Sequence, residues 1–277
     1  MCDHSREVNA MSPTQDAPVS DTPSIETQRR EARIDLAAAH RLAVMHGFNE
    51  GICNHLTLTV PGRPGAFYVI PYGLHWSEVT ASDFLEVAYD GTILAGEGEV
   101  ELTAYCIHAP IHRLKPDAAA VFHTHMPFAT ALTMLEDQRI EPIGQTAAIL
   151  HHQISYDDDY TGLAFDATEG ERLAGKLENG KNILMMANHG VMTAGRNVAE
   201  AYDRLYYLER AAQTQLYAYM SGQKRKRVRQ DVLQLLGEQM AKAAQGGHIV
   251  KDSLTPAQMH FRALKRILDR KEPDYVR

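Results

Sequence analysis

The chain has 277 residues, of which 44% are hydrophobic and 23% charged, a composition typical of a globular protein. Its net charge of −7 argues against a nucleic-acid-binding face, and its apolar runs are shorter than the roughly 18 residues that a membrane span needs. The amino-terminal segment lacks the apolar core of a secretory signal, and the three cysteines are scattered. We therefore expect a cytoplasmic protein with no nucleic-acid partner and no membrane partner.

Three regions are expected along the chain. Residues 1–24 are rich in Ser, Pro, Asp and Thr without an apolar period, which predicts a disordered tail. Residues 25–222 alternate helical and strand patterns, which favours one α/β domain. A helical extension is expected over residues 223–277, and the basic run KRKRVR at 224–229 is expected to be a solvated loop.

Helices and short strands alternate within the expected domain. The first helix has apolar residues at helical spacing and stops at Gly47. Pro127 opens another helix at its first turn, and the Asp-Gly pair at 90–91 indicates a hairpin. Helices are expected within residues 25–48, 101–115, 127–136, 166–181 and 198–222, and strands within residues 52–62, 67–73, 84–91, 118–125 and 182–190.

Two histidines one residue apart end the apolar strand AAAVFHTH. Alternate side chains of a strand point to the same face, so His123 and His125 would lie side by side, as a divalent metal requires. His189 follows another apolar strand in an Asn-His-Gly turn, at the kind of strand end where ligands collect. The three imidazoles predict a metal site, although 14 histidines also allow chance combinations.

Four stretches in this order resemble the class II aldolase/adducin family: CNHLTLTVPG, YGLHWSEVTASD, IHAPIHRLKPDAAAVFHTHMPFATAL, and NHGVMTAG with the helix after it. The similarity covers about residues 30–220. The resemblance implies a three-layer α/β/α sandwich with a central, mainly antiparallel sheet, and a homotetramer with sites between subunits. It also implies a divalent metal held by His123, His125 and His189.

The sequence departs from the family's sugar-phosphate aldolases at the acid/base residue. Those enzymes place a glutamate four residues before the helix histidine that corresponds to His108, and Ala104 stands there in this chain. Glu99 and Glu101 are candidates for a recruited base, although Glu101 lies on a different helix face. His108 is a further catalytic candidate. Three roles remain open for His108 and His112: hydrogen-bond partners of the metal ligands, a spare ligand, or buried histidines bonded to the backbone.

Several residues are candidates for substrate binding. Asn54 survives from the family's glycine-asparagine turn, whereas Tyr72 replaces a small hydroxyl residue of the phosphate-binding turns. Tyr72, His75 and Trp76 would form an apolar wall for an aryl or prenyl group, unless Trp76 is a core residue. By the resemblance, Tyr217 or Tyr219 would reach a neighbouring subunit's site; helix packing is the alternative. His151 and His152 are not family ligands, but either would line the pocket if it extends that far.

Without a carboxylate, three neutral imidazoles leave open positions around a divalent ion, which suits iron(II) chemistry. One branch of the family, the non-haem iron oxygenases of aminocoumarin antibiotic biosynthesis, converts a prenylated 4-hydroxyphenylpyruvate through a mandelate to 3-prenyl-4-hydroxybenzoate. The chain is similar to that branch in length and in its lost glutamate. We therefore favour an Fe(II)-dependent dioxygenase acting on an aromatic 2-oxo acid, with Zn or another divalent metal as the alternative ion.

Two other functions remain open. One is a class II aldolase-type lyase acting on a non-phosphorylated carbonyl substrate, with Glu99 or Glu101 recruited as the base. The other is an adducin-like, non-catalytic scaffold that keeps the fold. The intact set of three histidines argues against this function.

Overall fold

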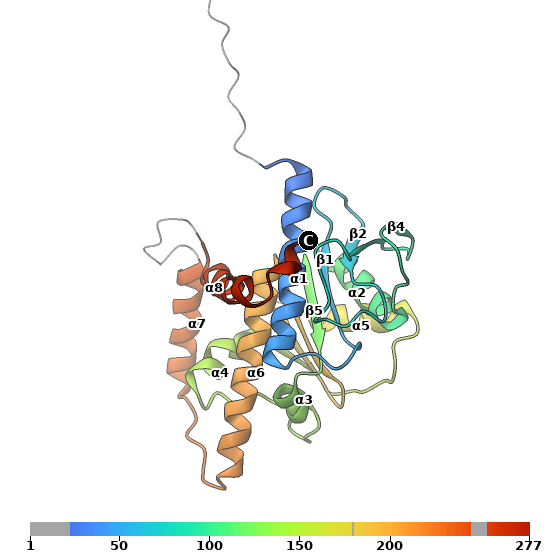
Figure 1. The fold of residues 1–277 in the computed structure, drawn as a ribbon. Helices are drawn as coiled ribbons and strands as arrows, with labels where there is room; N and C mark the ends of the chain where they lie inside the picture. The colour runs from blue at the N-terminus through green and yellow to red at the C-terminus, as the bar shows by residue number, and fades with distance from the viewer. Residues whose placement is uncertain (1–22, 179, 245–253) are drawn as a thin grey trace, which may run out of the picture.

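The computed structural model describes residues 23–178, 180–244 and 254–277. At its centre is an eight-stranded sheet with the order β4-β3-β2-β1-β5-β8-β7-β6 (Figure 1). All neighbouring strands are antiparallel except β6 and β7, which run parallel. The strands are β1 His55–Thr59, β2 Ala66–Val69, β3 Leu85–Ala88, β4 Ile93–Ala95, β5 Ala120–Thr124, β6 Ile154–Asp157, β7 Ile183–Met186 and β8 Gly190–Gly195.

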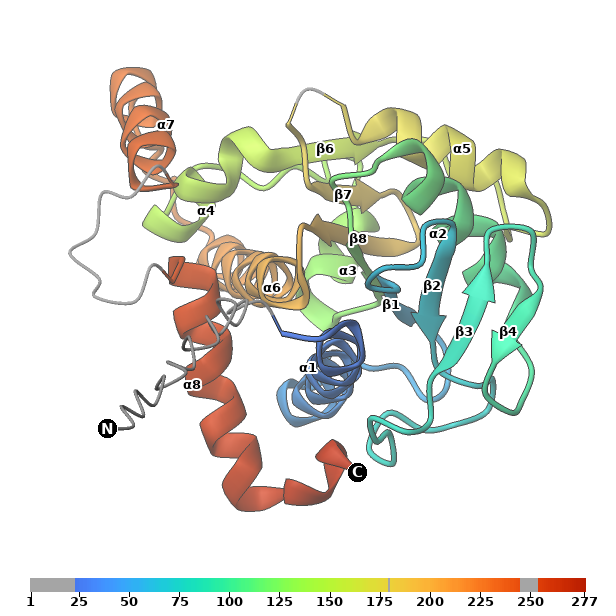
Figure 2. The same cartoon turned by 90° about the horizontal axis from the view of Figure 1, so that it is seen from above.

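Helices cover both faces of this sheet. Figure 2 shows α2 and α5 on one face and α1 and α6 on the other, so the predicted three-layer α/β/α sandwich is confirmed. The helices are α1 Ile25–His46, α2 Leu102–Leu114, α3 Pro127–Thr133, α4 Gln145–Leu150, α5 Ala167–Lys176, α6 Val198–Met220, α7 Gln230–Ala244 and α8 Pro256–Lys271, with the 3₁₀ turns η1 His151–Gln153 and η2 Pro273–Val276.

Local sequence signals explain where the helices begin and end. The Ser24 hydroxyl caps α1, and Gly47 ends the helix with a left-handed φ of 71°. Asp166 and Asn197 cap α5 and α6 with their side chains. Pro127 begins α3, where its missing N–H costs no helical hydrogen bond.

The alternation of side chains along β1 and β5 divides them between two cores. Leu56 and Phe122 belong to the apolar cluster under α1 and α6. Val121, from the same strand as Phe122, belongs to the cluster under α2 and α5. The Thr57 hydroxyl contacts His108 and His112 of α2. The odd-numbered residues of β1 and β5, such as Thr57 and Val121, therefore face α2.

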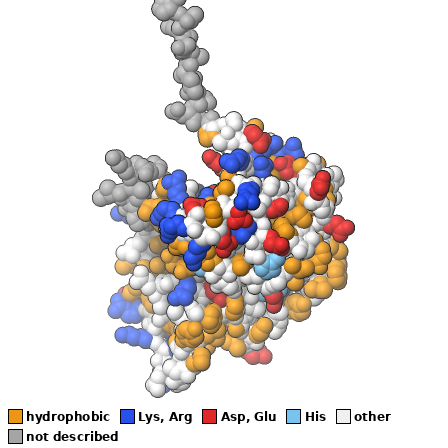
Figure 3. Space-filling model, in the orientation of Figure 1, with side chains coloured by type: hydrophobic (Ala, Val, Ile, Leu, Met, Phe, Trp, Pro, Cys, Tyr) orange, Lys and Arg blue, Asp and Glu red, His pale blue; other side chains and the backbone are white. Residues whose placement is uncertain are grey.

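The carboxyl-terminal helices pack on the sandwich. α7 contacts α4, and α8 crosses α1 and α6, where Phe261, Leu264 and Leu268 enter the α1 and α6 core. Buried Arg41 of α1 pairs with Glu272 and Asp274 just beyond α8. The outer side of α8 exposes Arg262, Arg266 and Arg270 at four-residue spacing. Figure 3 shows basic side chains in the region of this helix.

Two expectations concern segments outside the sandwich. The predicted tail falls almost entirely on residues 1–22, which lie outside the described residues. The basic run 224–229 is an exposed connection between α6 and α7, and two of its arginines form ion pairs with a buried carboxylate. Arg225 stacks over Tyr219 at 4.7 Å and pairs with buried Glu141 at 3.2 Å, and Arg227 pairs with the same carboxylate. Within the described ranges, no helix is both long and apolar enough to cross a bilayer.

The close approach of α5 to α2 depends on a glycine. A Cβ at Gly170 would lie 2.8 Å from the Ile107 carbonyl oxygen and closer still to that of Cys106, whereas a Cβ at Gly175 would meet nothing within 4 Å. We expect Gly170→Ala to lower the free energy of unfolding by about 1–3 kcal/mol. Gly175→Ala, on the same helix, should raise it by up to about 1 kcal/mol. Urea denaturation measures both, and equal effects would contradict a specific contact.

His40 makes stability depend on pH. It is fully buried in α1, and burial lowers its pKa from 6.5 to about 4. The unfolded chain therefore binds a proton that the folded protein resists, and stability falls as pH drops from about 6.5 towards 4, by up to about 1.4 kcal/mol per pH unit. His112, with a pKa also lowered to about 4 by burial, adds to this loss.

Replacing His40 removes its share of this pH dependence. We expect His40→Gln to lose less free energy of unfolding between pH 7 and pH 5 than the unsubstituted protein does, as measured by urea denaturation at each pH. An unchanged difference would show that His40 is protonated as easily in the folded protein as in the unfolded chain.

Candidate metal centre

The structure brings His123, His125 and His189 together at one edge of the sheet. His123 is the fourth residue of β5, His125 follows the strand, and His189 lies in the turn between β7 and β8. Their potential ligand atoms all lie within 4.8 Å of one another, and the ring centroids are 4.7 to 5.1 Å apart. We call these residues the three-histidine group. Three convergent imidazoles are a common ligand set for divalent transition metals.

The backbone around the β7–β8 turn is shaped to bring His189 close. Asn188 has a left-handed φ of 55°, and its N–H donates to the Thr133 carbonyl oxygen. A Cβ at Gly190 would lie 2.6 Å from His125 Cδ2 and 2.7 Å from the Thr124 carbonyl oxygen. Glycine therefore lets β8 begin directly against the ligand-bearing end of β5.

Hydrogen bonds orient two of the three rings. His123 Nδ1–H donates to the Val191 carbonyl oxygen at 2.9 Å, which leaves Nε2 as the free nitrogen. His125 Nδ1 is bonded to the Glu50 carboxylate, and its buried Nε2 has no partner among the described residues. The Asn54 side-chain oxygen accepts from the His125 backbone N–H at 3.3 Å. An orphaned ring nitrogen beside two other imidazoles fits a metal ligand.

Two of the three imidazoles are strongly biased toward the neutral form. Burial lowers the pKa of His123 well below its usual value, and the neighbouring histidines lower it further. Burial, followed by the charge of His125, lowers the pKa of His189 to about 4. A neutral imidazole is the form that binds metals, so these residues are ready to act as ligands at pH 7.

The candidates for a recruited base are placed differently. Glu101 caps the start of α2, where its Oε2 accepts from the Ala104 N–H and the Thr103 hydroxyl, both at 2.6 Å, and lies 3.0 Å from His55 Nε2. Burial by itself would raise the pKa of Glu101, but these hydrogen bonds outweigh it and hold the pKa at about 2. Glu99 is exposed to solvent. A carboxylate as acidic as Glu101 is a weak general base at neutral pH.

The helix histidines form a buried chain with Thr57. The Thr57 hydroxyl lies 2.7 Å from His108 Nδ1 and 2.8 Å from His112 Nε2, and His112 Nδ1–H donates to the Ala118 carbonyl oxygen. Neither ring belongs to the three-histidine group. His151 and His152 lie in η1, and His152 Nε2 reaches the Leu233 carbonyl oxygen of α7 at 3.4 Å.

The predicted substrate-binding residues are dispersed. Asn54 is buried beside His125 with a φ of 79°, and its Nδ2 has no hydrogen-bond partner in the part of the chain that the structure describes. Trp76 is fully buried in the core under α1, with its ring centroid 5.1 Å from that of His40, while Tyr72 is 57% exposed. His75 Nδ1 bonds to the Ser77 hydroxyl. In α6, the Tyr219 hydroxyl donates to Glu141, and exposed Tyr217 packs edge-on against Phe128.

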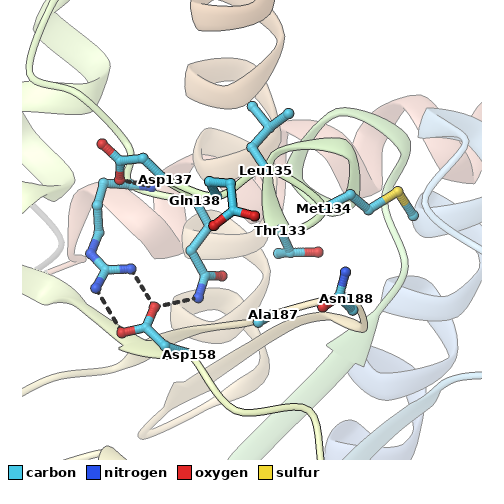
Figure 4. Close-up of a pocket in the computed structure, with 10 residues that line it drawn as sticks. Thr133, Met134, Leu135, Asp137, Gln138, Asp158, Ala187 and Asn188 are labelled. Carbon is cyan, nitrogen blue, oxygen red and sulfur yellow. Dashed lines mark hydrogen bonds and ion pairs between the residues drawn. The ribbon is translucent and has the colours of Figure 1, made fainter.

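A polar cavity of about 480 Å³ adjoins the β7–β8 turn. Figure 4 shows Gln138 and Asp158 hydrogen-bonded along one side of it and Asn188 on the other. Arg139 forms two hydrogen bonds with the Asp158 carboxylate. The lining reaches Asn188 but includes none of the three histidines, so the ligand chemistry, and not this cavity, identifies the candidate site.

Sequence reasoning missed two residues of this centre, Glu50 and His55. Glu50 lies in the loop between α1 and β1, where nothing in its neighbours indicates a contact with His125. His55 starts β1 and pairs directly with His123 in the sheet. The alternating pattern CNHLTLT predicted the strand, but its alignment with β5 was needed to find this contact.

Comparisons with known proteins show the family and agree with the fold. The model of the family described as Class II Aldolase and Adducin N-terminal domain matches residues 34–216, so the chain belongs to the class II aldolase/adducin family. A crystal structure of an aldolase II superfamily protein from Pseudomonas syringae matches with a TM-score of 0.81 at 31% identity, over 90% of this chain and 96% of that one.

Two curated relatives carry different names. An adducin-related protein of Schizosaccharomyces pombe is 37% identical over 67% of this chain, which spans 58% of that protein. The 4-hydroxy-3-prenylphenylpyruvate oxygenase/4-hydroxy-3-prenylbenzoate synthase of Streptomyces roseochromogenus is 30% identical over 79% of this chain and 79% of its own length. The family therefore includes proteins named as enzymes and proteins named for adducin.

The contact between Glu50 and His125 predicts a role in metal affinity. A carboxylate that accepts from a ligating histidine fixes the ring and strengthens its donor nitrogen, and losing such a partner weakens metal binding about 10- to 100-fold. We expect Glu50→Ala to lower the affinity for Zn²⁺ or Co²⁺ by that factor in a competition titration with a chelator. Glu97→Ala, which removes an exposed carboxylate from a loop, is the matched control. Equal affinities for the two variants would show that Glu50 does not support His125.

Proposed function

We propose that this protein is a metal-dependent enzyme, and that its best-supported activity is that of a non-haem Fe(II) oxygenase acting on a 4-hydroxyphenylpyruvate-type 2-oxo acid, with or without a prenyl group. The observation that carries the proposal is a ligand set of three imidazoles that contains no carboxylate among the described residues. Ala104 stands where the family's aldolases have their acid/base glutamate. The name of the Streptomyces relative supports the same chemistry.

His123, His125 and His189 would hold the ion, and their donor chemistry fits it. His123 and His125 each have an Nδ1 engaged by protein and an Nε2 left free, and imidazole suits iron as well as zinc. A bound Fe(II) ion supplies the redox chemistry that lets dioxygen react with an organic acid. Because the ligands are neutral, they leave the ion's positive charge to attract the carboxylate of a 2-oxo acid.

The carbon count of the proposed reaction fixes its stoichiometry. An aryl pyruvic acid has two more carbons than the corresponding benzoic acid, so two molecules of carbon dioxide leave. The first dioxygen converts the 2-oxo acid to a 2-hydroxy acid, a mandelate, with loss of one carbon dioxide. The second converts the 2-hydroxy acid to the benzoate with loss of a further carbon dioxide and one water. Neither half-reaction requires a carboxylate base like that of the aldolases.

A lyase is the main competing enzyme function. It requires a base for the substrate proton, and the two carboxylates that the sequence offered as recruited bases are poorly suited to that role. Glu101 is held ionised with a pKa of about 2, and Glu99 is exposed in a loop. An adducin-like scaffold is supported by the Schizosaccharomyces relative, but a scaffold has no need for three histidines whose potential ligand atoms lie within 4.8 Å of one another.

The proposal includes a homo-oligomer, with the site near a subunit boundary, as the family resemblance implies. Large apolar side chains stand exposed on the segment between β6 and α5 and at the ends of α3 and α6. Leu163 and Phe165 are 67% and 66% exposed, Met134 62% and Met220 81%. Figure 3 shows hydrophobic side chains gathered over the lower and right-hand parts of the face that it draws. Exposed apolar surface of this extent supports burial against further copies of the chain.

Oxygen uptake tests the proposed reaction. The protein is loaded with Fe(II) without air, 4-hydroxyphenylpyruvate or its 3-prenyl derivative is added, and dioxygen is admitted at an electrode. We expect uptake of two dioxygen molecules for each benzoate formed, with none in the zinc-loaded protein. His189→Ala should abolish uptake and weaken metal binding, because it removes one of three ligands. Zinc-supported cleavage of a hydroxy-carbonyl compound without oxygen uptake would assign the protein to the lyases instead.

A further inference from the structure

A fourth imidazole lies beside the three-histidine group without belonging to it. His55 pairs directly with His123 across β1 and β5, and their ring centroids are 5.7 Å apart. The side chain is almost completely buried, and its Nδ1 has no hydrogen-bond partner among the described residues. An unsatisfied polar atom at a buried position costs free energy, so it calls for an occupant that the protein alone does not supply.

Glu101 determines which nitrogen of His55 carries the proton. Its carboxylate is ionised, since hydrogen bonds hold its pKa at about 2, and an ionised carboxylate only accepts hydrogen bonds. His55 Nε2–H must therefore donate to Glu101 across the 3.0 Å contact. In the neutral imidazole this leaves Nδ1 as a bare acceptor, which needs a donor.

His108, the next ring, cannot be that donor. His112 donates Nδ1–H to the Ala118 carbonyl oxygen, so its Nε2 is an acceptor without a hydrogen of its own. It takes the single Thr57 hydroxyl hydrogen at 2.8 Å in preference to the Val121 carbonyl oxygen, which lies farther away at 3.2 Å. The Thr57 oxygen then accepts from His108 Nδ1–H at 2.7 Å, which leaves His108 Nε2 as a second bare acceptor. The rings of His55 and His108, whose centroids are 5.5 Å apart, therefore carry two bare acceptors, and neither ring has a donor left for the other.

We propose that His55 Nδ1 accepts a hydrogen bond from a hydroxyl group of the molecule bound at the metal centre, and that Glu101 is the positioning residue that fixes this tautomer. The inference rests on the proposed function, in which the 2-hydroxy acid carries a hydroxyl on the carbon next to its carboxylate. The corresponding 2-oxo acid has a carbonyl oxygen there, which cannot donate to a bare nitrogen. His55 thus favours the hydroxy acid and retains it between the two half-reactions.

Binding of two matched acids to the zinc-loaded protein tests this role without turnover. 4-Hydroxymandelate and 4-hydroxybenzoylformate share a carbon skeleton and differ only in the hydroxyl or carbonyl group at carbon 2. We expect calorimetry to show tighter binding of 4-hydroxymandelate. In His55→Gln the carboxamide still reaches Glu101 but offers no acceptor at the position of Nδ1. Its Kd for 4-hydroxymandelate should rise about 2- to 10-fold, while its Kd for the oxo acid and its zinc content stay unchanged.

Two further variants keep the test decisive if His55→Gln does not fold. Glu101→Ala frees His55 to carry its proton on either nitrogen, so the preference for the hydroxy acid should shrink. His151→Gln replaces a partly buried histidine in η1, away from the centre, and should keep the full preference.

The inference and the proposed function fail in different ways. If the wild-type protein prefers 4-hydroxymandelate and His55→Gln leaves that preference intact, weakens both acids equally or loses zinc, then His55 is not the acceptor and the proposed function stands. If the zinc-loaded wild-type protein binds neither acid, the proposed substrate class is wrong and the inference falls with it.

Discussion

The candidate site depends on the alignment of β5 with the two strands beside it. On one side His123 pairs with His55 of β1, and on the other β5 pairs with β8, whose Val191 carbonyl oxygen accepts from the His123 ring. A shift of one residue in either pairing would turn His123 to the opposite face of the sheet and into the core under α1 and α6. The antiparallel pairing at the centre of the sheet thus fixes the direction of the first ligand, its hydrogen-bond partner and its buried neighbour together.

The resemblance to the family's aldolases places Ala104 at the position of their acid/base glutamate. Glu101 stands one helical turn earlier, at the start of α2, where the Ala104 N–H, the Thr103 hydroxyl and His55 share one of its oxygens. A carboxylate held in this way stabilises the helix end and stays ionised, so it is poorly suited to exchange protons with a substrate. Its influence on the centre passes through His55. The contact with the Glu101 carboxylate keeps the proton on His55 Nε2, so that Nδ1 is the acceptor of the ring beside His123.

Sequence patterns with a short period were sufficient to predict the three histidines that the structure brings together. His123 and His125 follow from the two-residue period of a strand, and His189 from a turn after an apolar strand. Glu50 and His55 escaped because their contacts join segments about 70 residues apart in the chain, and no local pattern records which strands become neighbours. Trp76 shows the converse limit. Its neighbours in sequence suggested a pocket wall, but the chain after β2 turns back under α1 and buries the ring against His40.

The contacts behind the ligands connect metal binding to the stability of separate parts of the fold. His125 forms hydrogen bonds with Glu50 and Asn54 of the loop before β1. His189 lies in the β7–β8 turn, which is bonded to α3 because the Asn188 N–H donates to the Thr133 carbonyl oxygen. An ion bound to the three-histidine group would therefore cross-link that loop, the end of β5 and the β7–β8 turn. Because an ion that binds only the folded arrangement stabilises it, these segments gain the most order on metal binding.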